Sequence, residues 1–383
     1  MSISLYPAQQ DLVDVAQPNW FYRASMGTGK TFIAIAHYKK FFLGKKVLVI
    51  APKAVELSGS WQTSFEDMEV DRKFIKVIRT DAVNKVNPLD IKGSFIIIDE
   101  SHNFRNIGSK RTKSLLKLVK QSAGFVMLSG TPVDSKLDNL EAYAIAFGHV
   151  STRKQFKDLY MLPEVLPYAP YPVWIVARNQ EKLIDWFHSI SSKPLKLDDV
   201  TELLPVIEKV VHFYKSSEYR KSLPSYKKDD KFIFETPMER HWWQRQNQNT
   251  KAKLDWLIDI REEYEQEGLI IFYNTQSELE ALKTVFKNAG EINGSKHINN
   301  KSGVILVQIQ AGSAGLNLLE YRHAVWYSLP YSYTTFSQSK FRNYRNGQHK
   351  RVTRHYLIVD GTIDDKIMEA LNNKIDFNAK LEK

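Results

Sequence analysis

Two glycines, a lysine and a threonine near the N-terminus have the order and spacing that phosphate binding requires. Residues 24–31 read Ala-Ser-Met-Gly-Thr-Gly-Lys-Thr and lie between a strand-like run and a helix-like stretch. The glycines let the backbone N–H groups converge on phosphate oxygens, Lys30 would meet the β- and γ-phosphates, and Thr31 would hold Mg²⁺. Because Ala24 stands where the common pattern has glycine, the segment alone also fits a glycine turn before a helix. The residues expected to hold the nucleotide here are Met26, Gly27, Thr28, Gly29, Lys30 and Thr31.

Two adjacent carboxylates follow an apolar strand in the same part of the chain. The strand is Phe95–Ile98, and the carboxylates are Asp99 and Glu100. Asp99 is placed to hold Mg²⁺ through water, and Glu100 to orient and deprotonate an attacking water. A polar strand end that caps the next element would look the same. Because both motifs lie at the carboxyl ends of strands in one lobe, however, we expect them to meet at one crevice, which favours ATP hydrolysis.

The composition suits a polyanionic partner and excludes chemistry that depends on cysteine. Lys and Arg total 54 against 43 Asp and Glu, a net charge of +11 that fits nucleic acid, although solubility explains it nearly as well. The absence of cysteine excludes disulfides, thiolate metal sites and cysteine nucleophiles. The sequence has no zinc-ligand spacing and no Ser-His-Asp arrangement, so nuclease activity is not expected.

The hydrophobic pattern predicts an α/β protein of two lobes. Short apolar runs alternate with helix-like stretches over residues 1–148, which indicates a parallel sheet with helices on both faces. This alternation is lost over residues 149–245, interpreted as a mostly helical insertion and linker, and returns over residues 246–383. The predicted strands are Trp20–Arg23, Val47–Ile50, Phe95–Ile98, Phe125–Leu128, Leu269–Tyr273, Val304–Ile309, Ala324–Ser328 and Arg354–Val359. The predicted helices include Lys30–Leu43, Lys251–Glu265 and Ser277–Asn288.

The N-terminal sequence carries no targeting or membrane signal. The first ten residues have no basic stretch followed by an apolar run, and no window approaches about 18 uninterrupted apolar residues. We therefore expect a cytoplasmic protein that acts as a monomer, with an additional targeting partner left open.

The residues after the strand Phe95–Ile98 resemble a known family. Asp99-Glu-Ser-His102 is similar to the DEAH-type box of superfamily two helicases and translocases, and its continuation to Asn106 is similar to the SWI/SNF-type DNA translocases. The resemblance implies two RecA-like lobes, ATP and Mg²⁺ as cofactors, and duplex or branched DNA as partner. His102 is then expected to couple the nucleotide site to the nucleic-acid site, because Glu100 already supplies the base.

Two segments that flank the phosphate loop in sequence also resemble motifs of this family. Leu5–Gln9 is similar to the N-terminal glutamine motif, which implies that Gln9 contacts adenine, with Gln10 as the fallback. Val47–Lys53 is similar to the strand and loop that contact the nucleic-acid backbone, which implies such a contact from Lys53.

One motif at the end of the first lobe and one at the start of the second complete the nucleic-acid contacts. Leu128–Pro132 resembles the motif that couples hydrolysis to movement, which implies coupling roles for Ser129 and Thr131 and a nucleic-acid contact from Thr131. Leu269–Asn274 resembles the strand that opens the second lobe, with Asn274 as a further nucleic-acid contact.

A glycine-rich motif follows in the second lobe. Ala311–Leu318 resembles the family's motif that ends in Gly, any residue, Asn and Leu. The resemblance implies nucleotide contacts from Gly315 and Asn317 and a nucleic-acid contact from Ser313.

The final motif supplies two arginines. Gln338, Arg342, Arg345, Gly347 and Gln348 match the family's pattern at every spacing, and the first three are catalytic candidates. Charge that develops on a transferring γ-phosphoryl group needs cationic donors from outside the nucleotide loop, and arginine is always charged and forked. Three residues apart on a helix, the arginines would present both guanidiniums to one side and make hydrolysis depend on lobe closure. The resemblance favours Arg345 as the arginine finger; a solvated basic face or a plain phosphate contact is the alternative.

Taken with the resemblance, these residues predict an ATP-dependent translocase on duplex DNA that remodels junctions or protein–DNA complexes in replication, recombination or repair. A strand-separating DNA or RNA helicase and a nucleotide-gated clamp with little turnover are the alternatives. The short insertion makes chromatin remodelling doubtful, and a compact motor of this kind fits a bacteriophage or mobile element.

Two other features have a structural and a functional interpretation. Trp242 and Trp243 could stack on bases, but packing of a linker helix explains them better. A lysine patch at Lys221, Lys227, Lys228 and Lys231 could follow a phosphate backbone or be simply solvated.

Overall fold

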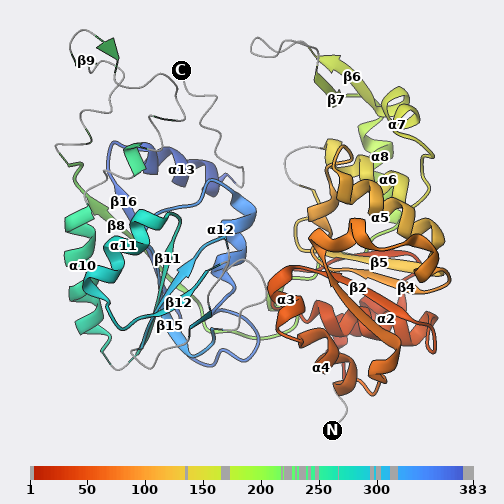
Figure 1. Ribbon diagram of the computed structural model, residues 1–383, viewed down its shortest axis with the longest axis horizontal. Helices are drawn as coiled ribbons and strands as arrows, with labels where there is room; N and C mark the ends of the chain where they lie inside the picture. The colour runs from red at the N-terminus through yellow and green to blue at the C-terminus, as the bar shows by residue number, and fades with distance from the viewer. Residues whose placement is uncertain are drawn as a thin grey trace. The chain divides into compact units, whose positions relative to one another are not determined.

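The computed structural model contains two compact units, Met1–Glu202 and Leu203–Lys383, each built on its own sheet (Figure 1). The predicted class, two α/β lobes with parallel sheets flanked by helices, is confirmed. In the part of the chain that the structure describes, no helix is long and apolar enough to cross a membrane. The described residues are 4–133, 137–164, 173–216, 219, 227–228, 231–232, 239, 243–245, 250–265, 267–293, 297–298, 303–310 and 318–373.

The first unit has a five-stranded parallel sheet in the order β1-β5-β4-β2-β3. Four of its strands are continuous apolar runs that are buried along almost their whole length, as expected when helices cover both faces. In Figure 1, α5 and α6 lie on one side of this sheet and α2 and α4 on the other. The strands are β1 (Trp20–Arg23), β2 (Val47–Ala51), β3 (Ile75–Arg79), β4 (Phe95–Ile98) and β5 (Gly124–Ser129). The helices are α1 (Pro7–Asp14), α2 (Lys30–Phe41), α3 (Lys53–Leu57), α4 (Ser60–Asp67), α5 (Lys110–Gln121) and α6 (Leu140–Ala146).

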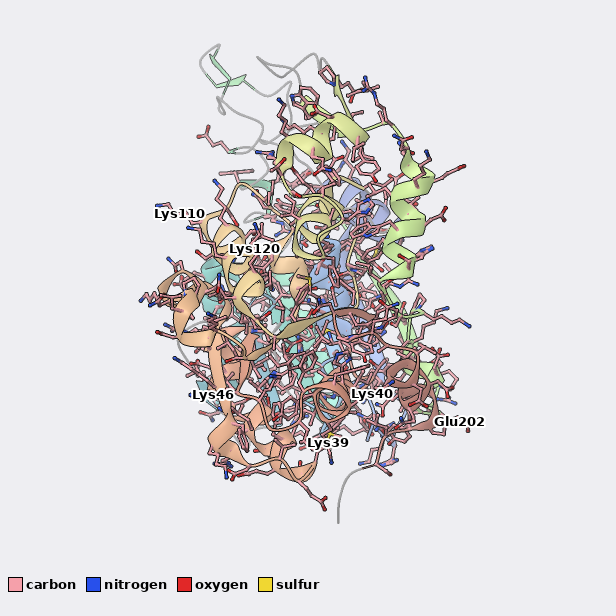
Figure 2. All side chains as sticks on the ribbon, turned by 90° about the vertical axis from the view of Figure 1, so that its right-hand side faces the viewer. Lys39, Lys40, Lys46, Lys110, Lys120 and Glu202 are labelled. Carbon is pink, nitrogen blue, oxygen red and sulfur yellow. The ribbon has the colours of Figure 1, made fainter. Side chains whose placement is uncertain are left out.

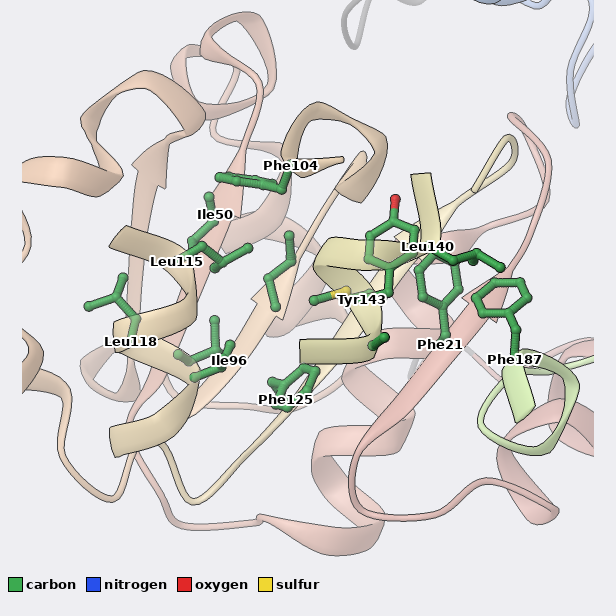
Figure 3. Packing of buried hydrophobic residues seen from close by; sticks show 14 of the residues in the cluster. Phe21, Ile50, Ile96, Phe104, Leu115, Leu118, Phe125, Leu140, Tyr143 and Phe187 are labelled. Carbon is green, nitrogen blue, oxygen red and sulfur yellow. The ribbon is translucent and has the colours of Figure 1, made fainter. Parts of the chain in front are cut away.

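Alternate strand residues divide the core of this unit between the two faces of the sheet. On one face, Leu115 and Leu118 of α5 pack with Ile50 and Ile96 of the strands (Figure 3). The same cluster continues to Phe21 on β1. The apolar side of α5 is therefore fixed against the sheet, and its other side is left to solvent.

The chain after α6 stays with the first unit as far as residue 202. It forms α7 (Arg153–Tyr160), the antiparallel pair β6 (Met161–Glu164) and β7 (Val173–Val176), and α8 (Gln180–Ser189). It then returns to β1, where Ser191 forms a bridge to Phe21 and Leu195 a bridge to Ala24. This part of the predicted linker is therefore an extension of the first unit, built from helices and one strand pair.

The second unit has a seven-stranded sheet in the order β13-β12-β14-β11-β15-β16-β8. All neighbouring strands are parallel except β12 and β13. The strands are β8 (Ile207–Phe213), β11 (Gly268–Tyr273), β12 (Gly290–Ile292), β13 (His297–Ile298), β14 (Val304–Gln308), β15 (Tyr321–Trp326) and β16 (Thr353–Val359). The helices are α10 (Thr250–Glu263), α11 (Gln276–Val285), α12 (Tyr333–Lys340) and α13 (Ile363–Asn372).

The two faces of the second sheet are covered by different helices. Leu257 of α10 and Leu279 of α11 belong to one core cluster, whereas Phe336 of α12 and Ile367 of α13 belong to the other. Both clusters include residues of β11 and β15, so these strands lie at the centre of the unit.

The start of this unit differs from the sequence prediction. Strand β8 lies within the segment assigned to the linker, yet it pairs in parallel with β16 over its whole length. As the edge strand it exposes most of its side chains, so it lacks the continuous apolar pattern of a central strand. The side chains of the predicted lysine patch and of Trp242 lie outside the described residues, whereas Trp243 is half-buried.

Candidate active site

The phosphate-loop segment forms a tight turn between β1 and α2. Gly27 and Gly29 have φ angles of 79° and 75°, in the left-handed region that glycine adopts without strain. Gly29 is the N-cap of α2, so the N-terminus of this helix, where the first backbone N–H groups have no partner four residues before them, lies at the loop. Thr28 is buried, and its hydroxyl donates to the Ser25 carbonyl at 2.7 Å. A glycine turn that leads into a helix N-terminus is the arrangement that phosphate binding requires.

Gln9 on α1 packs directly against this loop. Its amide nitrogen donates to the Thr28 carbonyl at 2.7 Å, and its amide oxygen accepts from the Tyr6 backbone N–H at 2.9 Å. A Cβ atom on Gly29 would lie 2.4 Å from that nitrogen, so the close approach requires glycine. Gln10 is exposed and bonds to Asp14 instead. The structure therefore brings Gln9, and not the fallback, to the predicted nucleotide site.

Lys30 and Glu100 join the loop to the carboxylate pair. The ammonium of Lys30 lies 2.7 Å from Glu100 Oε1, and the two side chains are only 11% and 13% exposed. Glu100 has a φ angle of 47°, uncommon for a residue with a side chain and a form of backbone strain that concentrates at functional sites. Its backbone N–H donates to Asp99 Oδ1 at 2.9 Å. Both predicted motifs thus meet at one place within the first unit.

The pKa values of the two neighbouring carboxylates, Asp99 and Glu100, are shifted in opposite directions. Burial raises the pKa of Asp99 to about 6, with a further contribution from the charge of Glu100. Burial would raise the pKa of Glu100 as well, but the ammonium of Lys30 and the imidazole of His102 hold it well below its usual range. Glu100 is therefore ionised, as a general base must be. Asp99 is a buried carboxylate whose ionised form a divalent cation would stabilise.

A chain of side-chain contacts continues from Glu100 to the end of β5. His102 Nδ1 lies 3.2 Å from Glu100 Oε2 and 3.3 Å from the Ser129 hydroxyl. The Ser129 hydroxyl accepts from the Thr131 backbone N–H at 3.1 Å. The strand order explains the contact, because β5 lies between β1, which leads into the loop, and β4, which ends at Asp99. The three predicted coupling residues are therefore contiguous with the carboxylate pair.

The residues present fit ATP with Mg²⁺. The N-terminus of α2 and Lys30 lie at the loop, where they would meet phosphate oxygens, and Asp99 would supply the hard oxygen ligand that Mg²⁺ prefers. Thr31, in the first turn of α2, is partly exposed and carries a hydroxyl suited to the same ion. Over the described residues, no group of three or more His, Asp or Glu side chains is arranged as a protein-only metal site.

The predicted nucleic-acid contacts differ in their surroundings. Lys53 is exposed at the start of α3, directly after β2, and Thr131 is partly exposed. The side-chain amide of Asn274 is already bonded to the carbonyl and hydroxyl of Ser328 at 3.0 and 2.8 Å. Asn274 therefore joins β11 to the residues after β15, whatever else it contacts. Ser313, Gly315 and Asn317 lie outside the described residues.

The arginine segment is not helical, which corrects the sequence prediction. Helix α12 contains Gln338, which is partly exposed, but ends at Lys340, so Arg342 and Arg345 lie in the turns that follow. Arg342 is buried, and its carbonyl accepts from the Leu318 N–H at 3.1 Å. Arg345 is partly exposed, and burial lowers its pKa. The two guanidiniums therefore have different surroundings and do not form one helical face.

Sequence reasoning missed the side chains that hold this segment. Arg354 on β16 donates to the Lys340 carbonyl at 2.7 Å, which ends α12, and its guanidinium carbon lies 5.3 Å from the centre of the Tyr344 ring. Glu208 on β8 accepts from Arg354 at 3.0 Å and from Tyr356 at 3.1 Å. A glutamate on an exposed strand and an arginine on a buried one gave no sequence signal that could have linked them.

Comparison with known proteins identifies related chains. A family model described as SNF2-related domain matches residues 75–267, about half of the chain. The chain is 25% identical over 430 residues to the Xenopus laevis protein named SWI/SNF-related matrix-associated actin-dependent regulator of chromatin subfamily A-like protein 1. That match covers 97% of this chain and 43% of the relative.

Two further matches have the same character. The human protein named DNA annealing helicase and endonuclease ZRANB3 is 23% identical over 330 residues, covering 78% of this chain and 30% of the relative. A solved structure, "Sulfolobus solfataricus SWI2/SNF2 ATPase core in complex with dsDNA", is similar with a TM-score of 0.44 and 18% identity, covering 98% of this chain and 92% of that one. The chain spans less than half the length of these two curated relatives.

Proposed function

The chain belongs to the family of proteins with an SNF2-related domain, and from this premise we propose that it is an ATP-dependent motor that moves along duplex DNA. The observation that carries the proposal is the continuous line of contacts from Lys30 through Glu100 and His102 to Ser129. A plain nucleotide-binding domain has no need for that continuation beyond the base. This continuation supports a site in which the state of the nucleotide affects the predicted DNA contacts.

In this proposal each residue of the first unit has a defined task. The loop N–H groups and Lys30 bind the β- and γ-phosphates, while Thr31 and Asp99 hold Mg²⁺, which neutralises charge on the phosphates. Glu100 orients the attacking water and takes its proton, for which its ionised state suits it. Binding of phosphate by Lys30 releases Glu100 from its ion pair with that lysine, so the base becomes available when ATP is present.

The second unit supplies positive charge in the same proposal. Arg345, the more accessible of the two arginines, meets the developing charge on the γ-phosphoryl group, and buried Arg342 holds the segment through the Leu318 contact. Hydrolysis then requires both units. A cycle of ATP binding and release would alternately engage and free the second unit, which is the movement that a translocase needs.

The choice of DNA rests on the family, the relatives and the charge. A DNA annealing helicase is among the relatives by name, and the net charge of +11 suits a phosphate backbone. We propose duplex or branched DNA as the track, with Lys53, Thr131, Asn274 and Ser313 as contacts, and remodelling of junctions or displacement of bound protein as the outcome.

ATPase rates with different polymers test this function. Turnover is measured with no polymer, with duplex DNA, with single-stranded DNA and with RNA. We expect the largest stimulation by duplex DNA; stimulation by RNA alone would overturn the proposal. Displacement of a third strand from a triplex without unwinding of a forked duplex distinguishes translocation from strand separation. Tight DNA binding with negligible turnover in every case would instead indicate a nucleotide-gated clamp.

A further inference from the structure

The exposed side of α5 carries a row of cations that the proposed ATP cycle does not use. The helix has the sequence Lys-Arg-Thr-Lys-Ser-Leu-Leu-Lys-Leu-Val-Lys-Gln and contains no acidic residue. Lys110, Lys113, Lys117 and Lys120 are spaced by three, four and three residues, so they lie on one side of the helix. All four are exposed, and Arg111 is exposed beside the first of them.

This lysine row is electrostatically unfavourable for the protein alone. Its successive members are like-charged neighbours at helical contact spacing, which destabilises a helix. Lys110, Arg111 and Lys113 also occupy the first turn, where the helix dipole favours acidic residues. Throughout the described ranges, no carboxylate forms an ion pair with any of the four lysines. An arrangement that opposes helix stability in two ways is explained if an anion binds to it.

The elements packed against α5 carry few carboxylates, and among the described residues none of these forms an ion pair with the row; Glu141 of α6 pairs with Arg153. The adjoining short helices η2 (Thr80–Lys85) and η3 (Pro88–Ile91) each carry one exposed aspartate, Asp81 and Asp90. Asp81 lies 3.5 Å from Arg79, and Lys85 adds a further positive charge. On its other side α5 is held in the core by Leu115 and Leu118 (Figure 3) and by Val119, so this side of the helix is not open to the lysines.

The dimensions of the row suit a nucleic-acid strand. Lys110 and Lys120 mark its two ends in Figure 2, and ten residues of helix span about 15 Å. A duplex strand carries one phosphate per 3.4 Å of axis, so a row of this length faces about four phosphates. The row also begins eight residues after the DEAH-like box, on the first α-helix after β4, and is separate in sequence from the predicted contacts Lys53 and Thr131.

We propose that the lysine row of α5 is a second nucleic-acid surface, which binds the backbone of a DNA segment distinct from the one on the predicted translocation contacts. This inference rests on the proposed function for its choice of nucleic acid over other polyanions. A second contact would hold another arm of a branched molecule, or a distant part of the same duplex, while the motor steps.

Salt-dependent DNA binding tests the proposal. The row variant changes Lys110, Lys113, Lys117 and Lys120 to Gln, which keeps helix propensity. The matched control changes four exposed lysines elsewhere on the unit, Lys45, Lys46, Lys182 and Lys193, to Gln and removes the same charge. Binding of a long blunt duplex and of a four-way junction is measured between low and high salt. For the row variant, the slope of log K against log salt should become shallower by about 0.9 for each phosphate that the protein no longer neutralises, and so by about 3.6 if each of the four lysines neutralises one.

Each outcome of the binding measurements either supports or overturns the proposed second nucleic-acid surface. Equal slopes for the row variant and the control variant would overturn the proposal, because only net charge would then count. A row variant that loses poly-glutamate binding but keeps DNA binding would assign the surface to an acidic protein and also overturn it. Changing the four lysines to Arg should retain the wild-type slope, and the double variant K113Q/K117Q should show about half of the change, which keeps the test valid if the row variant unfolds.

The proposed function can fail separately from this inference. Absence of polymer stimulation in the wild-type ATPase assay would refute the motor. The difference in slope between the row variant and the control variant is read from binding alone, so it would still stand or fall by itself.

Discussion

Replacing Glu100 with Gln should separate ATP binding from ATP turnover. The amide keeps the shape of the side chain but cannot accept the proton of the attacking water, so turnover should fall by about 10²- to 10⁴-fold, the usual contribution of a general base. Binding should change in the opposite direction. In the free protein, Lys30 is committed to Glu100 at 2.7 Å, and ATP must break that contact to engage the lysine.

The gain in affinity follows from the strength of the contact that ATP no longer has to break. A hydrogen bond to a charged group contributes about 1.5 to 3 kcal/mol, and the lower value is appropriate for side chains that keep some exposure. About 1.4 kcal/mol corresponds to a tenfold change in affinity, so the dissociation constant for Mg-ATP should fall by about tenfold.

The assay is a titration with a fluorescent ATP analogue, together with single-turnover hydrolysis. Glu66→Gln is the matched control, because this exposed glutamate pairs with Arg72 on the surface and its change removes the same charge. Undiminished turnover in the Glu100 variant would refute its role as the base. Weakened ATP binding would refute the competition between Glu100 and ATP for Lys30.

Gly29→Ala places a Cβ atom 2.4 Å from the Gln9 amide nitrogen at a φ of 75° and should lower both ATP affinity and stability by about 1–3 kcal/mol. Gly44→Ala, at a φ of 86° with open space around it, controls for backbone strain. If calorimetry and nucleotide titration showed equal losses for the two variants, the close contact between Gly29 and Gln9 would not be the cause. Arg354→Leu removes the bond that ends α12 and should lower the maximal ATPase rate by at least about tenfold with little change in ATP affinity; a changed affinity with an unchanged rate would count against it. Burial lowers the pKa of His355 to about 4, below the ordinary value of about 6.5, so protonation of this side chain favours the unfolded state. Its contribution to the free energy of unfolding is complete above pH 6.5 and falls with the pH, by at most about 2 kcal/mol at pH 5. The melting temperature of His355→Phe should therefore fall less between pH 7 and pH 5 than that of the wild type. Equal falls in the two proteins would show that this histidine does not cause the loss of stability.

The central strands and the loop could be predicted because their signals are local. Val47–Ala51 and Phe95–Ile98 are buried on both faces, so a continuous apolar run is the only pattern that their surroundings allow. The glycines of the phosphate loop are equally local, since a left-handed backbone angle is a property of one residue. A place for Gln9 at the nucleotide site was implied only by the family resemblance, and its contact with Thr28, which joins residues nineteen apart, was not predicted.

The elements that were missed depend on distant partners. Strand β8 has exposed side chains at most positions, so its pairing with β16 leaves no apolar pattern in the sequence. The end of α12 is also invisible locally, because the carbonyl of Lys340 is satisfied by Arg354 from the next strand. The spacing alone predicted that the helix continues through Arg342 and Arg345. This prediction was wrong because the spacing carries no information about the distant residue that bonds to the Lys340 carbonyl.

These two misses concern one piece of structure. The chain enters the second unit and within five residues becomes β8, where Glu208 accepts from Arg354. Arg354 in turn donates to the last carbonyl of α12 and lies beside the ring of Tyr344. In the sequence, Tyr344 stands between the two predicted catalytic arginines. The strand that follows the connection between the units is therefore also a support of the arginine segment. A variant of Glu208 or Arg354 should for this reason affect turnover through the position of the arginines, although neither side chain belongs to the nucleotide loop.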